Sequence, residues 1–168
     1  MCDVSIPNKE ISFIYVNEIL NKTNQNGIAV SIQQAIFTMN LDNLQIQLEK
    51  FMLQSISYFD GANEGFYHGM MLGLLAILSN NYDIRSNREA GLGRFDIMLS
   101  PKLSSMPGFI FEFKYTNDPK CDLDILANEA LTQIKDKKYD TGLLTSGINN
   151  IIKIGIAICG KKAIIKSQ

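Results

Sequence analysis

Two neighbouring apolar segments carry three ionisable residues whose spacing suits chemistry on a phosphate. Asp96 lies in the first segment, and Glu112 and Lys114 lie in the second. Side chains alternate across a strand, so Glu112 and Lys114 share one face while Phe111 and Phe113 take the other. A turn that brings Asp96 alongside would complete a small acidic pocket with one amine beside it. Such a pocket fits a hard divalent cation such as Mg²⁺ and the activation of water against a phosphodiester.

The same three residues have a structural alternative. Burying a carboxylate and an ammonium in an apolar strand costs free energy unless each has a partner. Glu112 paired with Lys114 on the surface of a sheet would supply that partner and would need neither metal nor substrate. Spacing alone leaves both interpretations open.

The hydrophobic pattern predicts the elements that must position these residues. Helices are predicted over 8–22, 29–39 and 42–57, and a largely apolar helix over 64–80. The segments that follow predict strands over 82–89, 94–100 and 109–115, a helix over 122–138, a buried strand over 151–159 and a short edge strand over 163–166. The order is α-β-β-β-α-β after the N-terminal helices, which indicates an α/β fold with a mixed central sheet flanked by helices.

Length and charge narrow the class of protein. The chain has 168 residues and a formal net charge of −1. The length suits one domain over 1–168, and the charge lacks the basic signature of many nucleic-acid binders. Contact with DNA or RNA must therefore come from a local patch or from a partner.

The cysteines and the apolar stretches indicate a cytoplasmic location. Cys2, Cys121 and Cys159 lack the spacing of a zinc site and are expected to be inert thiols in a reducing compartment. No secretory signal is evident at the N-terminus, and the apolar stretches are too short to span a membrane. We expect no membrane partner.

Many short motifs together resemble the PD-(D/E)XK nuclease superfamily, whose restriction-endonuclease-like core has the order αβββαβ. More narrowly, they resemble the C-terminal nuclease-like domain of bacterial AAA-ATPase-like proteins. The resemblance implies a nuclease core over 58–168 after a helical extension over 1–57. The matching residues include Ser86-Asn87-Arg88-Glu89, Gly93-Arg94-Phe95-Asp96-Ile97-Met98-Leu99, Glu112-Phe113-Lys114, Gln133-Ile134, Lys138-Tyr139 and Gly155-Ile156-Ala157.

The resemblance also implies a role for each site residue. Asp96 and Glu112 would bind Mg²⁺ or Mn²⁺ together with the backbone carbonyl of Phe113. Lys114 would hold the attacking water or stabilise charge on the phosphate. Two further polar residues match the superfamily's first and second core helices, Glu64 and Gln133. Glu64 has an alternative as an acid favoured by the helix dipole.

Two further positions, Tyr139 and His68, have roles that the sequence leaves open. Some relatives of this superfamily have a Tyr four residues after the Gln, whereas Tyr139 follows Gln133 by six, so that pair is in doubt. His68 lies one helical turn after Glu64 and is either a packing residue or a contact to the site.

The remaining cations also have two interpretations. Arg88 and Arg94 flank a glycine-containing turn and either pair with a nearby carboxylate or contact phosphate. Two groups of lysines form either a solvated face or, if the helix over 122–138 and the last strand are neighbours, a phosphate-binding rim. These are lysines 135, 137 and 138 and lysines 161, 162 and 166. The GxxxxG spacing of Gly142 and Gly147 is not followed by Lys-Ser/Thr, so an ATP-binding loop is excluded there.

The sequence therefore predicts a metal-dependent nuclease that hydrolyses phosphodiester bonds. The expected substrate is nucleic acid, with DNA favoured over RNA, and an AAA-type ATPase domain is expected as a further partner. The alternative is an inactive module of the same fold that docks nucleic acid or protein for such an ATPase. The sequence does not distinguish DNA from RNA or endonuclease from exonuclease, and it leaves the oligomeric state and the pathway open.

Overall fold

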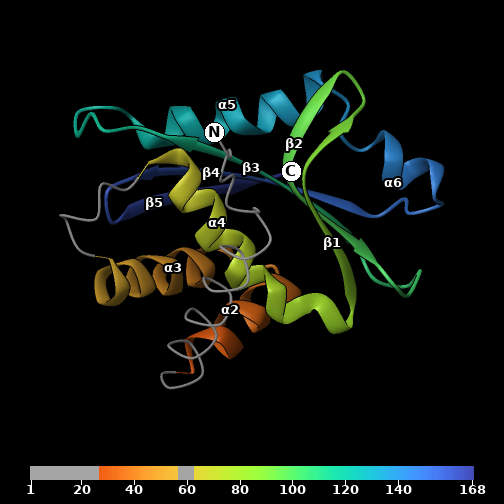
Figure 1. Cartoon of the computed structure of the whole chain (residues 1–168), viewed down its shortest axis with the longest axis horizontal. Coiled ribbons are helices and arrows are strands. Elements are labelled where there is room, and N and C mark those ends of the chain that lie inside the picture. The colour runs from red at the N-terminus through yellow and green to blue at the C-terminus, as the bar shows by residue number, and fades with distance from the viewer. Residues whose placement is uncertain (1–26, 57–62) are drawn as a thin grey trace, which may run out of the picture.

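A single five-stranded sheet forms the centre of the molecule (Figure 1). The structure is a computed structural model that describes residues 27–56 and 63–168. The strands follow one another across the sheet in chain order: β1 (Tyr82–Ala90), β2 (Gly93–Pro101), β3 (Gly108–Tyr115), β4 (Ile151–Cys159) and β5 (Lys162–Ser167). Only β3 and β4 are parallel, and the other neighbours are antiparallel. The sheet is therefore mixed.

Helices cover both faces of this sheet (Figure 1). One face carries α2 (Ile28–Phe37), α3 (Leu41–Ser55) and α4 (Glu64–Leu75), which a short 3₁₀ helix (Ala76–Asn80) joins to β1. The other face carries α5 (Leu123–Asp136), the crossover between the two parallel strands, and α6 (Thr141–Thr145) follows it. The predicted α/β class and the αβββαβ order are confirmed.

Side-chain caps fix where three of the helices begin. Asn40, Asn63 and Asp122 each accept a hydrogen bond from a backbone N–H in the first turn of α3, α4 and α5. These bonds satisfy donors that a helix start leaves without a partner. For α4 the cap places Glu64 at the first helical position, next to the sheet.

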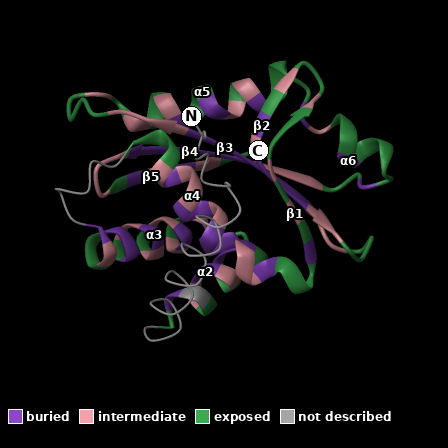
Figure 2. Ribbon diagram, viewed as in Figure 1, coloured by how far each residue is buried: buried purple, intermediate pink, exposed green. Residues whose placement is uncertain are grey.

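The buried residues form two clusters, one on each face of the sheet. Figure 2 marks the buried residues along the ribbon in purple. The larger lies under α2, α3 and α4 and contains Phe109, Phe111 and Phe113, whereas Ile110 belongs to the smaller cluster under α5 and α6. The predicted alternation along β3 is therefore confirmed. Glu112 shares the face of Ile110 and points toward α5.

Some predicted elements differ in extent from the observed ones. The predicted helix over 64–80 ends as an α-helix at Leu75, where the 3₁₀ turn begins. Helix α6 was not predicted, because its five residues, Thr-Gly-Leu-Leu-Thr, are too few to show a helical period. The predicted helix over 8–22 lies outside the described residues. Among the described helices, none combines the length and the apolar character needed to cross a bilayer.

Candidate active site

Strands β2 and β3 separate at Asp96. Their last pair at this end of the ladder is Ile97 with Phe111. Beyond that pair the Asp96 side chain bridges the two strands, because its Oδ2 accepts a hydrogen bond of 2.9 Å from the N–H of Phe113. The fork thus holds the Asp96 carboxylate beside the segment of β3 that carries the other charged residues.

The backbone around Asp96 departs from a regular ladder. Phe95 and Ile97 would share a face of a regular strand, yet Phe95 packs in the smaller cluster and Ile97 in the larger. Across the hairpin the ladder pairs Ser86 with Ile97 and Arg88 with Phe95 but does not pair Asn87 between them, which has a φ of +52°. Few residues other than glycine adopt this region, although Asn tolerates it. Local irregularities of this kind re-aim a side chain, here that of Asp96.

Glu112 is buried with one carboxylate oxygen unpaired. The residue is 3% exposed, and its Oε1 accepts a hydrogen bond from the Nε2 of Gln133. Its Oε2 is also buried and has no hydrogen-bond partner. Burial, with the nearby charge of Asp96 adding to it, raises the pKa of Glu112 from 4.5 to about 8. The charge of Lys114 and hydrogen bonds with the backbone of Asp96 and with Gln133 lower this pKa, but they do not cancel the effect of burial.

Gln133 of α5 connects the two charged residues of β3. Its Oε1 accepts a hydrogen bond from Lys114 Nζ, while its Nε2 donates to Glu112. Among the described residues Glu112 and Lys114 form no direct ion pair. The arrangement therefore differs from the structural alternative of a Glu–Lys pair exposed on the sheet.

Tyr139 also reaches Gln133, despite its unusual spacing. Gln133 Nε2 lies 3.3 Å from the hydroxyl of Tyr139 and donates to it. Helix α5 ends in a Schellman turn, in which Tyr139 N–H donates to the carbonyl of Ile134 and Lys138 N–H to that of Lys135. Lys138 has a φ of +53° in this turn and reverses the chain. The six-residue spacing thus supports the Gln–Tyr contact that the sequence left in doubt.

Asp96 lies between charges of both signs. Burial raises the pKa of Asp96, while the hydrogen bond from Phe113 N–H opposes that change. The charges of His68 and Lys114 lower this pKa, and that of Glu64 raises it. Asp96 is therefore within electrostatic reach of α4 as well as of β3.

The two predicted residues of α4 occupy different positions. Glu64 is exposed at the first turn of α4, and its charge raises the pKa of Asp96. His68 lies closer, because its Nε2 is 3.2 Å from the backbone carbonyl of Asp96 and 3.4 Å from Ser86 Oγ. His68 also packs edge-on against Phe113. It therefore supports the bent part of β2, as the packing interpretation expects.

The donors at the fork fit a hard cation. Within 27–56 and 63–168 no three His, Cys, Asp or Glu side chains gather as a metal-binding group. The fork offers fewer side-chain donors: the carboxylates of Asp96 and Glu112, together with the backbone of Phe113. The unpaired, buried Oε2 of Glu112 needs a positive partner, and oxygen ligands are those that Mg²⁺ and Mn²⁺ prefer.

Comparison with a protein-family model agrees with this fold. A search of curated proteins gave no significant match. The sequence profile described as the PD-(D/E)XK nuclease superfamily matches residues 62–168, well over half of the chain. The matched range includes the residues at the fork and in α4 that were expected from the sequence: Asp96, Glu112, Lys114, Gln133 and Glu64. The chain belongs to the PD-(D/E)XK nuclease superfamily.

Proposed function

We propose that this protein is a metal-dependent nuclease that hydrolyses phosphodiester bonds in DNA. The observation that carries the proposal is the buried Oε2 of Glu112, which has no hydrogen-bond partner and lies within electrostatic reach of Asp96. A residue with only a structural role has no need of an unpaired buried carboxylate oxygen, since such an atom costs free energy. A divalent cation bound between the two carboxylates would offset that cost.

Each residue at the fork has a role in this proposal. Asp96, Glu112 and the backbone carbonyl of Phe113 would hold one or two Mg²⁺ or Mn²⁺ ions. The bound metal supplies a Lewis acid that lowers the pKa of water and neutralises charge on the phosphate. Lys114 orients the attacking water or stabilises the negative charge that develops on the phosphate. Glu64, exposed and within electrostatic reach of Asp96, would help to order the metal or its waters.

Gln133 positions two of these groups. Its carbonyl oxygen fixes the ammonium of Lys114, and its amide nitrogen fixes one oxygen of Glu112. This leaves the other oxygen of Glu112 free to bind a cation. The hydroxyl of Tyr139 accepts a hydrogen bond from the same Nε2 and helps to fix the orientation of Gln133, so both groups of β3 are oriented before substrate arrives.

Calorimetric titration of Mn²⁺ tests the metal site. We expect the parent protein to bind Mn²⁺ and Asp96→Ala to lose that binding, because the variant removes one of two carboxylate ligands. Asp83→Ala is the matched control, since Asp83 is an exposed acid at the far end of β1. Equal Mn²⁺ binding by the parent and Asp96→Ala would contradict the assignment of the site.

Cleavage of DNA tests the activity itself. We expect Asp96→Asn and Lys114→Met to lower the rate of hydrolysis by about 100-fold or more, since each removes a group that stabilises the transition state. Asp83→Asn should retain the parent rate. A folded parent that binds DNA but cleaves neither DNA nor RNA with any divalent cation would favour the alternative, a docking module for an AAA-type ATPase.

A further inference from the structure

The lysines of α5 and those of the last strand lie apart. Lys166 of β5 forms an ion pair with Asp124 in the first turn of α5, whereas lysines 135, 137 and 138 lie at the other end of that helix. Fourteen residues of helix separate its ends by about 20 Å. The single rim considered from the sequence is thus divided, and the C-terminal lysines of α5 have other neighbours.

Those neighbours are the residues of the β1–β2 hairpin, whose tip rests on the end of α5 (Figure 1). Leu92 N–H donates a hydrogen bond of 2.7 Å to the carbonyl of Lys137. Gly91 has a φ of +56°, and a Cβ there would lie 2.2 Å from Lys137 O and 2.3 Å from Lys138 O. The hairpin is therefore anchored on α5 at a distance that only glycine permits.

The contact joins two sets of cations into one surface, which we name the basic ridge. It consists of the exposed parts of 88–94 and 135–138, and its cations are Arg88, Arg94, Lys135, Lys137 and Lys138. Two exposed acids also lie in these segments, Glu89 and Asp136. Five cations and two carboxylates give the ridge a formal charge of +3, although the whole chain carries −1.

The cations of the ridge are not neutralised within the described part of the protein. The ion pairs there are Lys153 with Asp140 and Lys166 with Asp124, and neither includes a residue of the ridge. Arg88 and Arg94 therefore lack the salt bridges to Glu89 or Asp96 that the structural interpretation expects. Exposed, unpaired cations on one surface attract a polyanion at low ionic strength.

The ridge begins beside the candidate active site. Arg94 lies two residues from Asp96 on β2, about 7 Å along the strand. Lys137 lies four residues after Gln133, about 6 Å along the helix axis. Successive base pairs of a duplex rise by about 3.4 Å, so the cations lie about two nucleotides from the fork.

We propose that the basic ridge binds the phosphate backbone of duplex DNA and holds one strand over the fork between Asp96 and Glu112. This inference rests on the proposed nuclease function and adds the surface that positions its substrate. Leu92, 69% exposed at the hairpin tip, is the only exposed large apolar side chain in the ridge. The ridge therefore has no exposed aromatic side chain. Single-strand binders stack bases on aromatic side chains, so this surface suits the backbone of a duplex.

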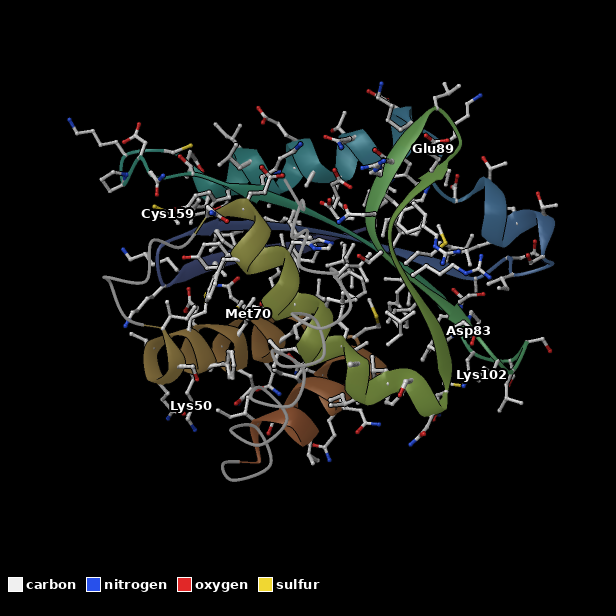
Figure 3. All side chains as sticks on the ribbon, in the orientation of Figure 1. Lys50, Met70, Asp83, Glu89, Lys102 and Cys159 are labelled. Carbon is white, nitrogen blue, oxygen red and sulfur yellow. The ribbon has the colours of Figure 1, made fainter. Side chains whose placement is uncertain are left out.

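Binding of a labelled DNA duplex, measured by fluorescence anisotropy in EDTA across a range of salt concentrations, tests the ridge without catalysis. We expect Arg94→Gln/Lys137→Gln to weaken binding about 10-fold at low salt and to reduce the slope of log K against log salt by about 2. Glu89→Lys should strengthen binding, because it removes an acid from the ridge and adds a cation. The control is Lys50→Gln/Lys162→Gln, two exposed lysines outside the ridge; Figure 3 shows Lys50 and Glu89 at opposite ends of the molecule.

The outcomes separate this inference from the proposed function. A parent that binds the duplex through the ridge but cleaves nothing supports the ridge and contradicts the nuclease. A parent that cleaves DNA, with binding unchanged in both Arg94→Gln/Lys137→Gln and Glu89→Lys, overturns the ridge alone. Tighter binding to a single strand than to the duplex, or equal weakening by the control pair, also overturns it.

Discussion

Glu112 links the chemistry of the fork to the stability of the fold. Its pKa is raised from 4.5 to about 8, chiefly by burial. Between these pH values the unfolded chain has released a proton that the folded protein still holds. The free energy of unfolding therefore falls as pH rises from about 4.5 to 8, in the absence of a bound cation.

We predict that Glu112→Gln stabilises the metal-free protein at pH 8 and abolishes metal-dependent cleavage. The amide can still accept the hydrogen bond from Gln133 but carries no charge to bury. The gain should be on the order of 2 kcal/mol at pH 8, within the limit of about 5 kcal/mol that the two pKa values imply. Urea unfolding in EDTA at several pH values measures it.

The same titration contains its own control. Near pH 4.5, Glu112 is neutral in the folded chain and about half ionised in the unfolded chain, so the parent and Glu112→Gln should differ by only about 0.4 kcal/mol. A difference between them that is the same at pH 4.5 and pH 8 would show that the carboxyl is not held neutral by burial.

At the same scale, the sequence predicted which residues meet but not how they meet. Strand alternation and the turn between the strands predicted that Asp96, Glu112 and Lys114 lie together, whereas Gln133 was expected there only from the resemblance to the superfamily. The unpaired Oε2 of Glu112 and the link from Lys114 through Gln133 depend on side-chain geometry across elements. No local period encodes that geometry.

At the scale of elements, the hairpin and the end of α5 depend on each other. Gly91 permits the close approach, and Leu92 N–H satisfies a carbonyl that the end of a helix leaves without a partner. A Cβ at Gly93 would lie 3.2 Å from the hydroxyl of Tyr139, so the same approach borders the Gln133 contact. The position of the hairpin therefore affects both the fork and the basic ridge.

We predict that Gly91→Ala destabilises the protein by about 2 kcal/mol or more and weakens DNA binding. Alanine is strained at a φ of +56°, and its Cβ would collide with backbone oxygens that cannot rotate away. Thermal unfolding and anisotropy measure the two effects. Gly142→Ala is the control, since a Cβ at Gly142 meets no atom within 4 Å, and an unchanged melting temperature for both variants would contradict the docking of the hairpin.

The sequence predicted the observed strands to within a few residues, because their β-branched and aromatic runs are bounded by turn residues. It did not predict the Schellman turn after α5. That motif normally has glycine or asparagine in the left-handed position, and here Lys138 occupies it. The positive φ of Asn87 was not predicted from the sequence either, because it accompanies the fork in the sheet, which no local pattern indicates.

At the scale of the whole molecule, α3 protects an edge of the sheet. β5 is an edge strand, and its outward N–H groups at Ala163 and Ile165 donate to Glu49 Oε1 and Gln45 Oε1 of α3, at 2.9 and 3.3 Å. Helices α2 and α3 also supply apolar side chains to the larger cluster, among them Ile32, Ile36, Leu44, Leu48, Phe51 and Met52. The segment before the superfamily match thus shares a core with the sheet.

We predict that the fragment 62–168, which corresponds to the superfamily match, does not fold alone. Removing α2 and α3 exposes the apolar face of the sheet and an unprotected edge strand, and both favour aggregation. Size-exclusion chromatography and circular dichroism of the fragment and the full chain measure this. Gln45→Ala/Glu49→Ala in the full chain should lower the unfolding free energy by about 1–3 kcal/mol, whereas the exposed Lys50→Ala should not. A monomeric fragment with the cooperative unfolding of the full chain would show that the sheet needs no cover from these helices.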